Sequence, residues 1–252
     1  MINRIKPTEQ IYSNYTPEDF LVWNVLFSRQ MHALSSSASK DFLDAVETIG
    51  FHEDEIPDFK KVNARLASLT GWKIITVPGI CPPAEFFKLL AQKTFTCTCW
   101  LRKMEELDYL EEPDMFHDVF GHVPLLTNPV YCNFFQALGE LAMEHIEDQE
   151  VIDMLERLYW FTIEFGLIKQ EGELKIYGSG IISSIGETKH ALGDSRKHAF
   201  DADKIMEHPF RTDIMQDDYY VIHSFEQLVA SLPAIRRKLE TLRIERINLE
   251  RA

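Results

Sequence analysis

The chain has 252 residues, 45% of them apolar and 12% aromatic, which is enough to bury one large core. Its formal net charge of −14 excludes the basic surface that nucleic acid or an anionic membrane requires. No stretch approaches the roughly 18 apolar residues of a membrane span, and the opening MINRIKPTEQIYSNY lacks the apolar core of a signal peptide. We therefore expect a cytoplasmic protein.

The first third of the chain is predicted to be helical. Thr16 opens the sequence TPED, which combines an N-cap, a proline at the first helical position and acid in the first turn. Residues 38–49 and 57–69 repeat an apolar pattern at helical period, and a glycine follows each of them.

Short strands are expected in the rest of the chain. Residues 72–77 are alternating and β-branched, and residues 95–102 and 219–222 are further candidates. Residues 81–93 begin a helix with prolines near its start, and residues 174–187 indicate a strand, a glycine turn and another helix.

Longer helices are predicted at residues 129–146, 149–170, 224–232 and 234–247. Together the elements predict a mainly α domain with a few short strands, and not a doubly wound sheet. The four cysteines have no CxxC spacing, so we expect free thiols in a reducing compartment.

Two histidines lie five residues apart in PDMFHDVFGH, residues 113–122. On an ideal helix five residues span about 500°, so the two rings would point roughly 140° apart. We expect Gly121 to let the helix end or bulge by one residue, which would turn His122 toward His117.

Glu164 lies in the apolar sequence YWFTIEFG, where a buried carboxylate needs a partner or a metal. Two histidines and one carboxylate bind one face of ferrous iron and leave the other positions open. His117, His122 and Glu164 are therefore a candidate iron site, with Asp118 supporting the ligands from behind, and the alternative from the spacing alone is that the histidines are structural.

Three further classes of protein use similar residues. A zinc hydrolase would place its histidines four apart in HExxH, and no such motif is present. A 2-oxoglutarate oxygenase would need an HxD motif on a β-barrel, and this chain has too few strands. A non-enzymatic helical metal-binding protein stays open as an alternative.

Several stretches resemble one family in its own order: VPG, PPAEFF, WLR, EPDMFHDVFGHVPLLTNP, LYWFTIEFGL, YGSGIISSIGE and YYVIHSF. From about residue 72 to residue 228 the chain is similar to the catalytic domain of the tetrahydropterin-dependent aromatic amino acid hydroxylases, most of all the short bacterial phenylalanine 4-monooxygenases. The resemblance implies that fold, Fe(II) at the three ligands above, a tetrahydropterin such as tetrahydrobiopterin, and ring hydroxylation with O2.

The resemblance also implies how an aromatic amino acid is held. Arg102 corresponds to the arginine that grips the substrate carboxylate, and Asp114 to the acid that holds that arginine. Trp160 corresponds to a wall of the ring pocket, and Ser183 to a serine near the substrate and an iron-ligating histidine. Trp160 and Val221 resemble the phenylalanine-selective members, so L-phenylalanine to L-tyrosine is expected, with tryptophan or tyrosine as the alternative substrate.

For the pterin, the resemblance implies a loop that reads the ring edge and an aromatic ring that stacks on it. The two prolines after Cys81 depart from the mammalian pattern and have no backbone N–H. The residues expected to bind the cofactor are Gly79, Cys81, Phe86, Asp118 and Tyr159.

One catalytic domain is expected over residues 1–252, without a regulatory domain. It would consist of a helical lead-in (1–71), the iron, pterin and substrate core (72–228) and a C-terminal helix (229–252). That helix is short for a coiled coil, so we expect it to pack on its own domain in a monomer.

Overall fold

Helices form most of the backbone, and their ends follow from local sequence. In the computed structural model, which describes residues 6–108 and 110–250, the Thr16 side chain accepts a hydrogen bond from the Asp19 amide, and the Asp19 carboxylate accepts one from the Thr16 amide. Gly50, at φ +80°, closes the second helix. The expectations for residues 1–5, 109, 251 and 252 lie outside the described residues.

The helices and strands run in the following order. The α-helices are α1 (Pro17–Leu34), α2 (Lys40–Ile49), α3 (Phe59–Leu69), α4 (Pro83–Ala91), α5 (Pro129–Glu144), α6 (Gln149–Tyr159), α7 (Ser179–Ile182), α8 (Ile185–Leu192), α9 (Ala202–Glu207) and α10 (Phe225–Glu250). The strands are β1 (Lys73–Thr76), β2 (Thr94–Cys97), β3 (Leu167–Gln170), β4 (Glu173–Ile176), β5 (Arg196–Ala199) and β6 (Asp218–Ile222).

Five shorter helical segments complete this order. Three are 3₁₀ turns, η1 (Tyr12–Asn14), η2 (Met104–Glu106) and η4 (Pro124–Thr127). The other two are π-helices, η3 (Phe116–His122) and η5 (Trp160–Glu164). Both π-helices contain predicted metal ligands, and π-helical turns are frequent at functional sites.

The strands form two small sheets. β1 pairs in parallel with β2, and the other sheet has the order β4-β3-β6-β5, in which only the β3–β4 pair is antiparallel. A mainly helical domain with few short strands is therefore confirmed.

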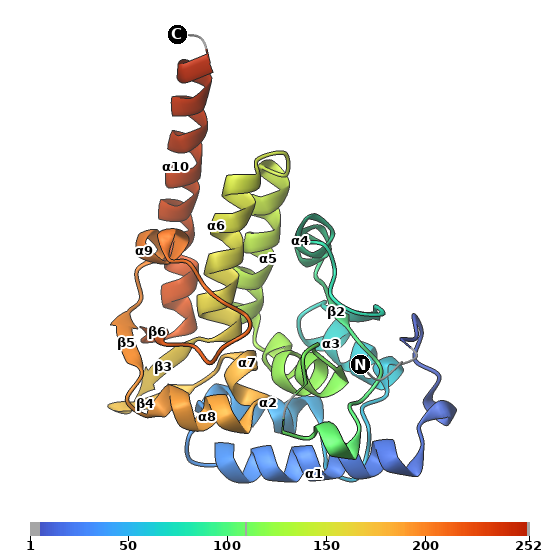
Figure 1. Cartoon of the computed structure of the whole chain (residues 1–252). Helices are drawn as coiled ribbons and strands as arrows, with labels where there is room; N and C mark the ends of the chain where they lie inside the picture. The colour runs from blue at the N-terminus through green and yellow to red at the C-terminus, as the bar shows by residue number, and fades with distance from the viewer. Residues whose placement is uncertain (1–5, 109, 251–252) are drawn as a thin grey trace.

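The helices surround the π-helix η3 (Figure 1). Its Phe120 ring meets Phe27 of α1 at 5.3 Å and Phe42 of α2 at 5.8 Å. Gly121 lies so close to α7 that a Cβ would come within 3.0 Å of the Ser179 carbonyl oxygen. Aromatic packing on one side and the missing side chain on the other hold η3 against the core.

Three of the predicted helices are wrong in extent. The helix expected at 149–170 ends in η5, and residues 167–170 form β3, because Gly166 packs against Tyr177 with no room for a Cβ and β3 pairs with β4 and β6. The two helices expected near the C-terminus are one, α10, which continues through Pro233 and extends beyond the rest of the fold (Figure 1).

Besides the three 3₁₀ turns, β3, β5 and α9 have no counterpart in the sequence prediction. The β5 sequence, RKHA, has no alternating apolar pattern, and the strand is paired with β6 through four register positions. Pairing with a neighbour therefore decides its conformation more than its own composition. Within the described residues, none of the helices is long and apolar enough to cross a membrane.

Replacing Gly139 with alanine should destabilise the fold by about 1–3 kcal/mol or more, because its Cβ would lie 2.4–2.9 Å from the backbone of α4. Chemical denaturation would measure the change. Glu140→Ala, an exposed substitution on the same helix, is the control and should change stability by less than about 0.5 kcal/mol. Equal stability of the two variants would contradict the close α4–α5 contact.

Candidate metal centre and its cavity

The π-helical turn η3 brings the two histidines of PDMFHDVFGH together. In a π-helix each backbone hydrogen bond spans five residues, so residues five apart lie close to the same face. The Nε2 atoms of His117 and His122 are accordingly 3.4 Å apart. The predicted bulge at Gly121 is therefore confirmed, and it extends over the whole of η3.

Glu164, the last residue of η5, faces both histidines. Its two carboxylate oxygens lie 3.1 Å from His122 Nε2 and 3.7 Å from His117 Nε2. Within the described chain these three residues form the one His/Cys/Asp/Glu group with metal-binding geometry, their ligand atoms all lying within 4.8 Å of one another. Ser179 donates to the same carboxylate at 2.8 Å.

The protonation of His117 fits metal binding. Ser183 donates its hydroxyl proton to the Ser179 carbonyl at 2.8 Å, so its oxygen accepts from His117 Nδ1–H, also at 2.8 Å. This hydrogen bond leaves the lone pair of His117 on Nε2, which is the atom that faces Glu164. Ser183 therefore orients His117, as a residue behind a metal ligand does.

The electrostatics of the centre also fit a cation. Burial alone would raise the pKa of Glu164, but the neighbouring His122, together with His117 and Ser179, outweighs burial and lowers that pKa to about 2. Within the described residues no lysine or arginine forms an ion pair with this 8% exposed carboxylate. A buried carboxylate with two imidazole Nε2 atoms beside it is the donor set that suits a divalent metal.

Asp118 lies behind the centre, where its place in the sequence predicts it. Its carboxylate accepts from the amide and the hydroxyl of Thr98, at 2.7 and 2.8 Å. Burial raises the pKa of Asp118 to about 6, although His117 and the Thr98 hydrogen bonds act in the opposite direction. Asp118 therefore connects the end of β2 to η3.

Arg102 and Asp114 form a buried bidentate pair. Arg102 Nε and Nη2 each donate to one carboxylate oxygen of Asp114 at 2.9 Å, and the Arg102 amide donates a third bond at 2.9 Å. Burial would raise the pKa of Asp114, but Arg102 outweighs burial and lowers it. Asp114 also accepts from the His117 amide at 3.2 Å, so the pair is connected to the metal centre.

A cavity of about 920 Å³ opens beside the three converging side chains and reaches the surface. Every residue predicted to bind metal, cofactor or substrate lines this cavity except Asp114, which is fully buried behind Arg102. The predicted residues in the lining are Gly79, Cys81, Phe86, Arg102, His117, Asp118, His122, Tyr159, Trp160, Glu164 and Ser183.

An aromatic group forms one wall of the cavity. Tyr159 meets Phe86 edge to face at 5.2 Å and stacks beside His122 at 6.4 Å. The two prolines after Cys81 begin α4, where a missing N–H costs nothing. The amides of Gly79 to Cys81 therefore remain as the donors of this loop, and Phe86 lines the same cavity.

Val221 is one of the two residues whose resemblance to the phenylalanine-selective members leads us to expect phenylalanine as the substrate. It pairs with Leu167 and Ala199 inside the sheet and does not line the cavity. The resemblance of Val221 to the phenylalanine-selective members therefore stays a prediction, without a direct place in the cavity lining. Residues before it in the chain, Thr212 and Asp213, line the cavity instead.

Several cavity residues carry no signal in the local sequence. They come from α1, from the segment between Arg102 and Asp114, from α6 and from the loop before β6, and include Arg29, Gln30, Leu107, Glu156, Phe210 and Gln216. Their patterns are those of ordinary helix and loop positions, so tertiary packing alone brings them to the site.

The fold and the site define a class of protein: one in which two histidines and one carboxylate would hold a single metal ion beside an open cavity. Comparison with known proteins narrows this class. The family model of the biopterin-dependent aromatic amino acid hydroxylases matches residues 4–244. The chain belongs to this family.

Individual relatives agree with the family match. The chain is 43% identical over 222 residues to phenylalanine-4-hydroxylase of Ralstonia nicotianae, which covers 87% of the chain and 71% of that protein. It is 33% identical over 231 residues to tyrosine 3-monooxygenase of Bos taurus, covering 90% of the chain and 47% of that protein.

A solved structure is similar throughout. Phenylalanine hydroxylase from Chromobacterium violaceum with bound iron(III) and the oxidized cofactor 7,8-dihydrobiopterin superposes with a TM-score of 0.86 at 41% identity. The match covers 92% of this chain and 85% of that one. The expected catalytic-domain fold is confirmed.

Replacing Asp114 with asparagine should destabilise the protein by about 3–5 kcal/mol at pH 7, because the buried Arg102 loses its counter-charge. The folded-state pKa of Asp114 is lowered, so its contribution is present above the unfolded value of about 3.9 and is lost as the pH falls below it. Urea denaturation of both proteins between pH 7 and pH 3 should show the difference shrinking.

The matched control is Asp213→Asn, which removes an exposed pair with Arg211. It should change stability by less than about 1 kcal/mol at every pH. A difference for Asp114→Asn that stays constant down to pH 3 would contradict a stabilising role for the Asp114 charge.

Proposed function

We propose that this chain is an iron- and tetrahydropterin-dependent monooxygenase that hydroxylates L-phenylalanine to L-tyrosine with O2. One observation carries the proposal: His117, His122 and Glu164 converge at a cavity that also presents the Arg102 guanidinium and the Phe86 ring. The phenylalanine hydroxylases among the similar proteins support the choice of substrate.

In this proposal the three converging side chains hold Fe(II). When bound, the iron and the reduced pterin together supply the electrons and the open coordination positions with which O2 is activated. Ser183 keeps His117 in the tautomer that presents Nε2, and Ser179 keeps Glu164 turned toward the histidines.

Arg102 would bind the amino acid carboxylate. Asp114 occupies its Nε and one side of Nη2, while Nη1 makes only a long contact of 3.4 Å to the Leu107 carbonyl. The remaining donors therefore suit a carboxylate in the cavity, at a guanidinium whose orientation is already fixed. Trp160 would then flank the aromatic ring and help to exclude water.

Phe86 would stack on the pterin, with Tyr159 beside it and the amides near Gly79 and Cys81 at the ring edge. Asp118 would line the cofactor site as well, and its hydrogen bonds to Thr98 hold its carboxylate in place.

Tyr159 also lies beside Glu164. Burial and that carboxylate raise the pKa of the Tyr159 phenol, so the hydroxyl stays protonated and available to donate a hydrogen bond.

We also propose that residues 1–71, 72–228 and 229–252 act as one catalytic domain, in a cytoplasmic monomer. Burial of Ile235 and Leu239 on the domain supports packing of α10 in cis, and the four free cysteines suit a reducing compartment. Sedimentation velocity would test the monomer, since a concentration-dependent dimer would contradict it.

The proposal is tested with protein loaded anaerobically with Fe(II) and then given a tetrahydropterin, O2 and, separately, L-phenylalanine, L-tyrosine or L-tryptophan. Tyrosine formed from phenylalanine with the highest kcat/KM is the expected result. Preference for tryptophan would overturn the substrate, and no hydroxylated product despite bound iron would favour a metal-binding protein without this activity.

Glu164→Ala should abolish metal binding and hydroxylation while leaving the fold intact, because it removes a buried charge and strands none. Added Fe(II) or Co(II) at about 100 times Kd should stabilise the wild type by about 2.7 kcal/mol. The variant should show no such shift in a thermal melt, whereas Glu140→Ala should shift as the wild type does. Wild-type turnover by Glu164→Ala would remove this residue from the site.

Arg102→Lys should chiefly weaken binding of the amino acid, since lysine cannot keep both the Asp114 pair and a substrate carboxylate. We expect KM for phenylalanine to rise by about tenfold or more, in line with the loss of a charge-assisted hydrogen bond, while KM for the pterin stays constant. Unchanged saturation with phenylalanine would count against the carboxylate role.

A further inference from the structure

Gln216 is the most fully hydrogen-bonded residue of the loop that joins α9 to β6. It is 6% exposed, and its side-chain oxygen accepts from Trp160 Nε1 at 3.0 Å. Its side-chain nitrogen donates to the carbonyls of Arg211 and Ile214, at 2.8 and 3.1 Å. One amide group thus connects Trp160 to the backbone of this loop.

The backbone of Gln216 is held as well. Its amide donates to the Glu187 carboxylate at 3.1 Å, and its carbonyl accepts from His190 Nε2 at 2.9 Å. The second Glu187 oxygen accepts from the Tyr219 hydroxyl. Glu187 belongs to α8 and Tyr219 to β6, and both are buried. Gln216 is therefore connected to the core through these two elements.

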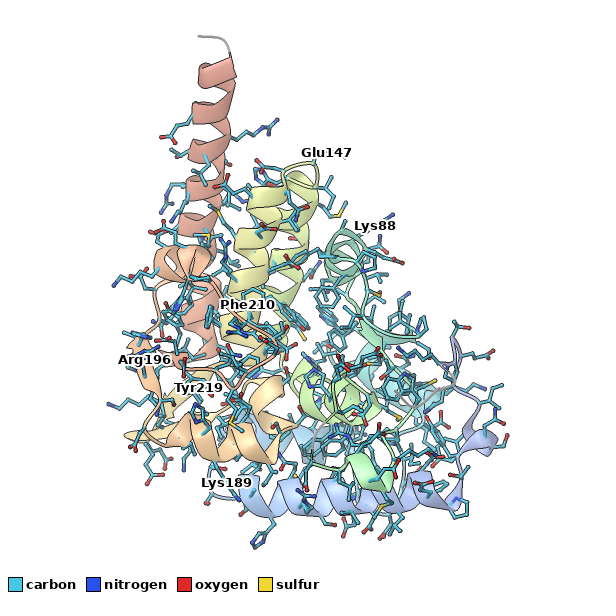
Figure 2. The ribbon with its side chains drawn as sticks, in the orientation of Figure 1. Lys88, Glu147, Lys189, Arg196, Phe210 and Tyr219 are labelled. Atoms are coloured by element: carbon cyan, nitrogen blue, oxygen red, sulfur yellow. The ribbon has the colours of Figure 1, made fainter. Side chains whose placement is uncertain are left out.

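This loop, residues 208–217, forms a wall of the cavity, and we call it the cavity loop. It contains no helix or strand, so side-chain hydrogen bonds replace a backbone ladder in holding its shape. Its Phe210 ring, labelled in Figure 2, stacks on Trp160 with centroids 4.5 Å apart and planes at 19°. Ile214 and Met215, also in the cavity lining, are about half exposed.

The contacts converge on one pair of rings. Trp160 is fixed by Gln216 through its N–H and by Phe210 through its face, and Phe210 itself belongs to the loop that Gln216 holds. Loss of the side-chain carboxamide of Gln216 would release both the Trp160 indole and the cavity loop. Because the loop lies at the surface, water can replace the lost hydrogen bonds, so the wall would move while the core stays folded.

We propose that Gln216 is a positioning residue that sets the width of the aromatic pocket and thereby the choice among aromatic amino acids. The inference rests on the proposed function. In this proposal the held wall limits the space beside Trp160 to a six-membered ring, and a released wall would admit the larger indole and orient phenylalanine less well. A difference of this kind changes specificity rather than the chemistry at the metal.

The test uses Gln216→Met, which keeps the side-chain volume and removes its polar atoms. The ratio of kcat/KM for phenylalanine to that for tryptophan should fall about tenfold, while Co(II) affinity stays within twofold of the wild type. Gln136→Met is the matched control, because Gln136 hydrogen-bonds to Ala91 and Glu140, outside the cavity lining. Its ratio should not change.

A second readout does not depend on activity. The difference in tryptophan emission between each protein and its Trp160→Phe counterpart isolates Trp160, and in Gln216→Met this emission should shift because the indole N–H has lost its acceptor. Gln216→Glu keeps an acceptor for Trp160 but loses the donors to Arg211 and Ile214. It should keep the wild-type emission and still lose selectivity, which separates the loop contacts from the indole contact.

The outcomes distinguish the two proposals. A selectivity ratio within twofold of the wild type in Gln216→Met, with a lowered melting temperature, would make Gln216 merely structural and overturn the inference. Unchanged Trp160 emission in that variant would overturn it too, even if the wild-type protein hydroxylates none of the three amino acids. A wild-type protein that hydroxylates none of the three amino acids would overturn the proposed function, and that result comes from the wild-type assay alone.

Discussion

The rest of the site depends on a buried carboxylate that has no lysine or arginine partner in the described structure. Glu164 is tolerable in the core because two imidazoles face it, and they can do so only because η3 and η5 are wound one residue wider than an α-helix. Each π-helical turn by itself replaces good helical hydrogen bonds with poorer ones. Aromatic packing around η3 and the close approach of Gly121 to α7 hold the wider turn in place.

Sequence reasoning identified the metal-binding candidates because burying an acid in YWFTIEFG and spacing histidines five apart both break local rules. It also located most helices, whose caps and apolar periods are local signals. It missed β5 and the end of the helix after residue 159, because those conformations are decided by pairing partners distant in the chain. Nor does any local signal tell a strand position inside the sheet, such as Val221, from a position in the cavity wall.

The cavity has walls of two kinds. On the Phe86 side the residues belong to helices α4 and α6, packed by apolar contact. On the Trp160 side a loop without regular structure is held by polar contacts to Gln216 and Glu187. Hydrogen bonds specify geometry sharply but are easily exchanged with water, whereas close packing leaves no alternative arrangement. The two walls therefore differ in how they respond to substitution.

The close contact of Gly139 with α4 limits which parts of this fold can change during evolution. Backbone atoms of α4 lie where a side chain on α5 would be, so the helix that carries Phe86 has no freedom to shift without rebuilding two helices at once. Change would then be easier on the opposite side of the cavity, where the cavity loop is free of helix and strand and contains none of the three metal-binding candidates. In the proposed enzyme the shared cofactor chemistry would be inherited as a rigid unit, and new substrates would be reached through the loop.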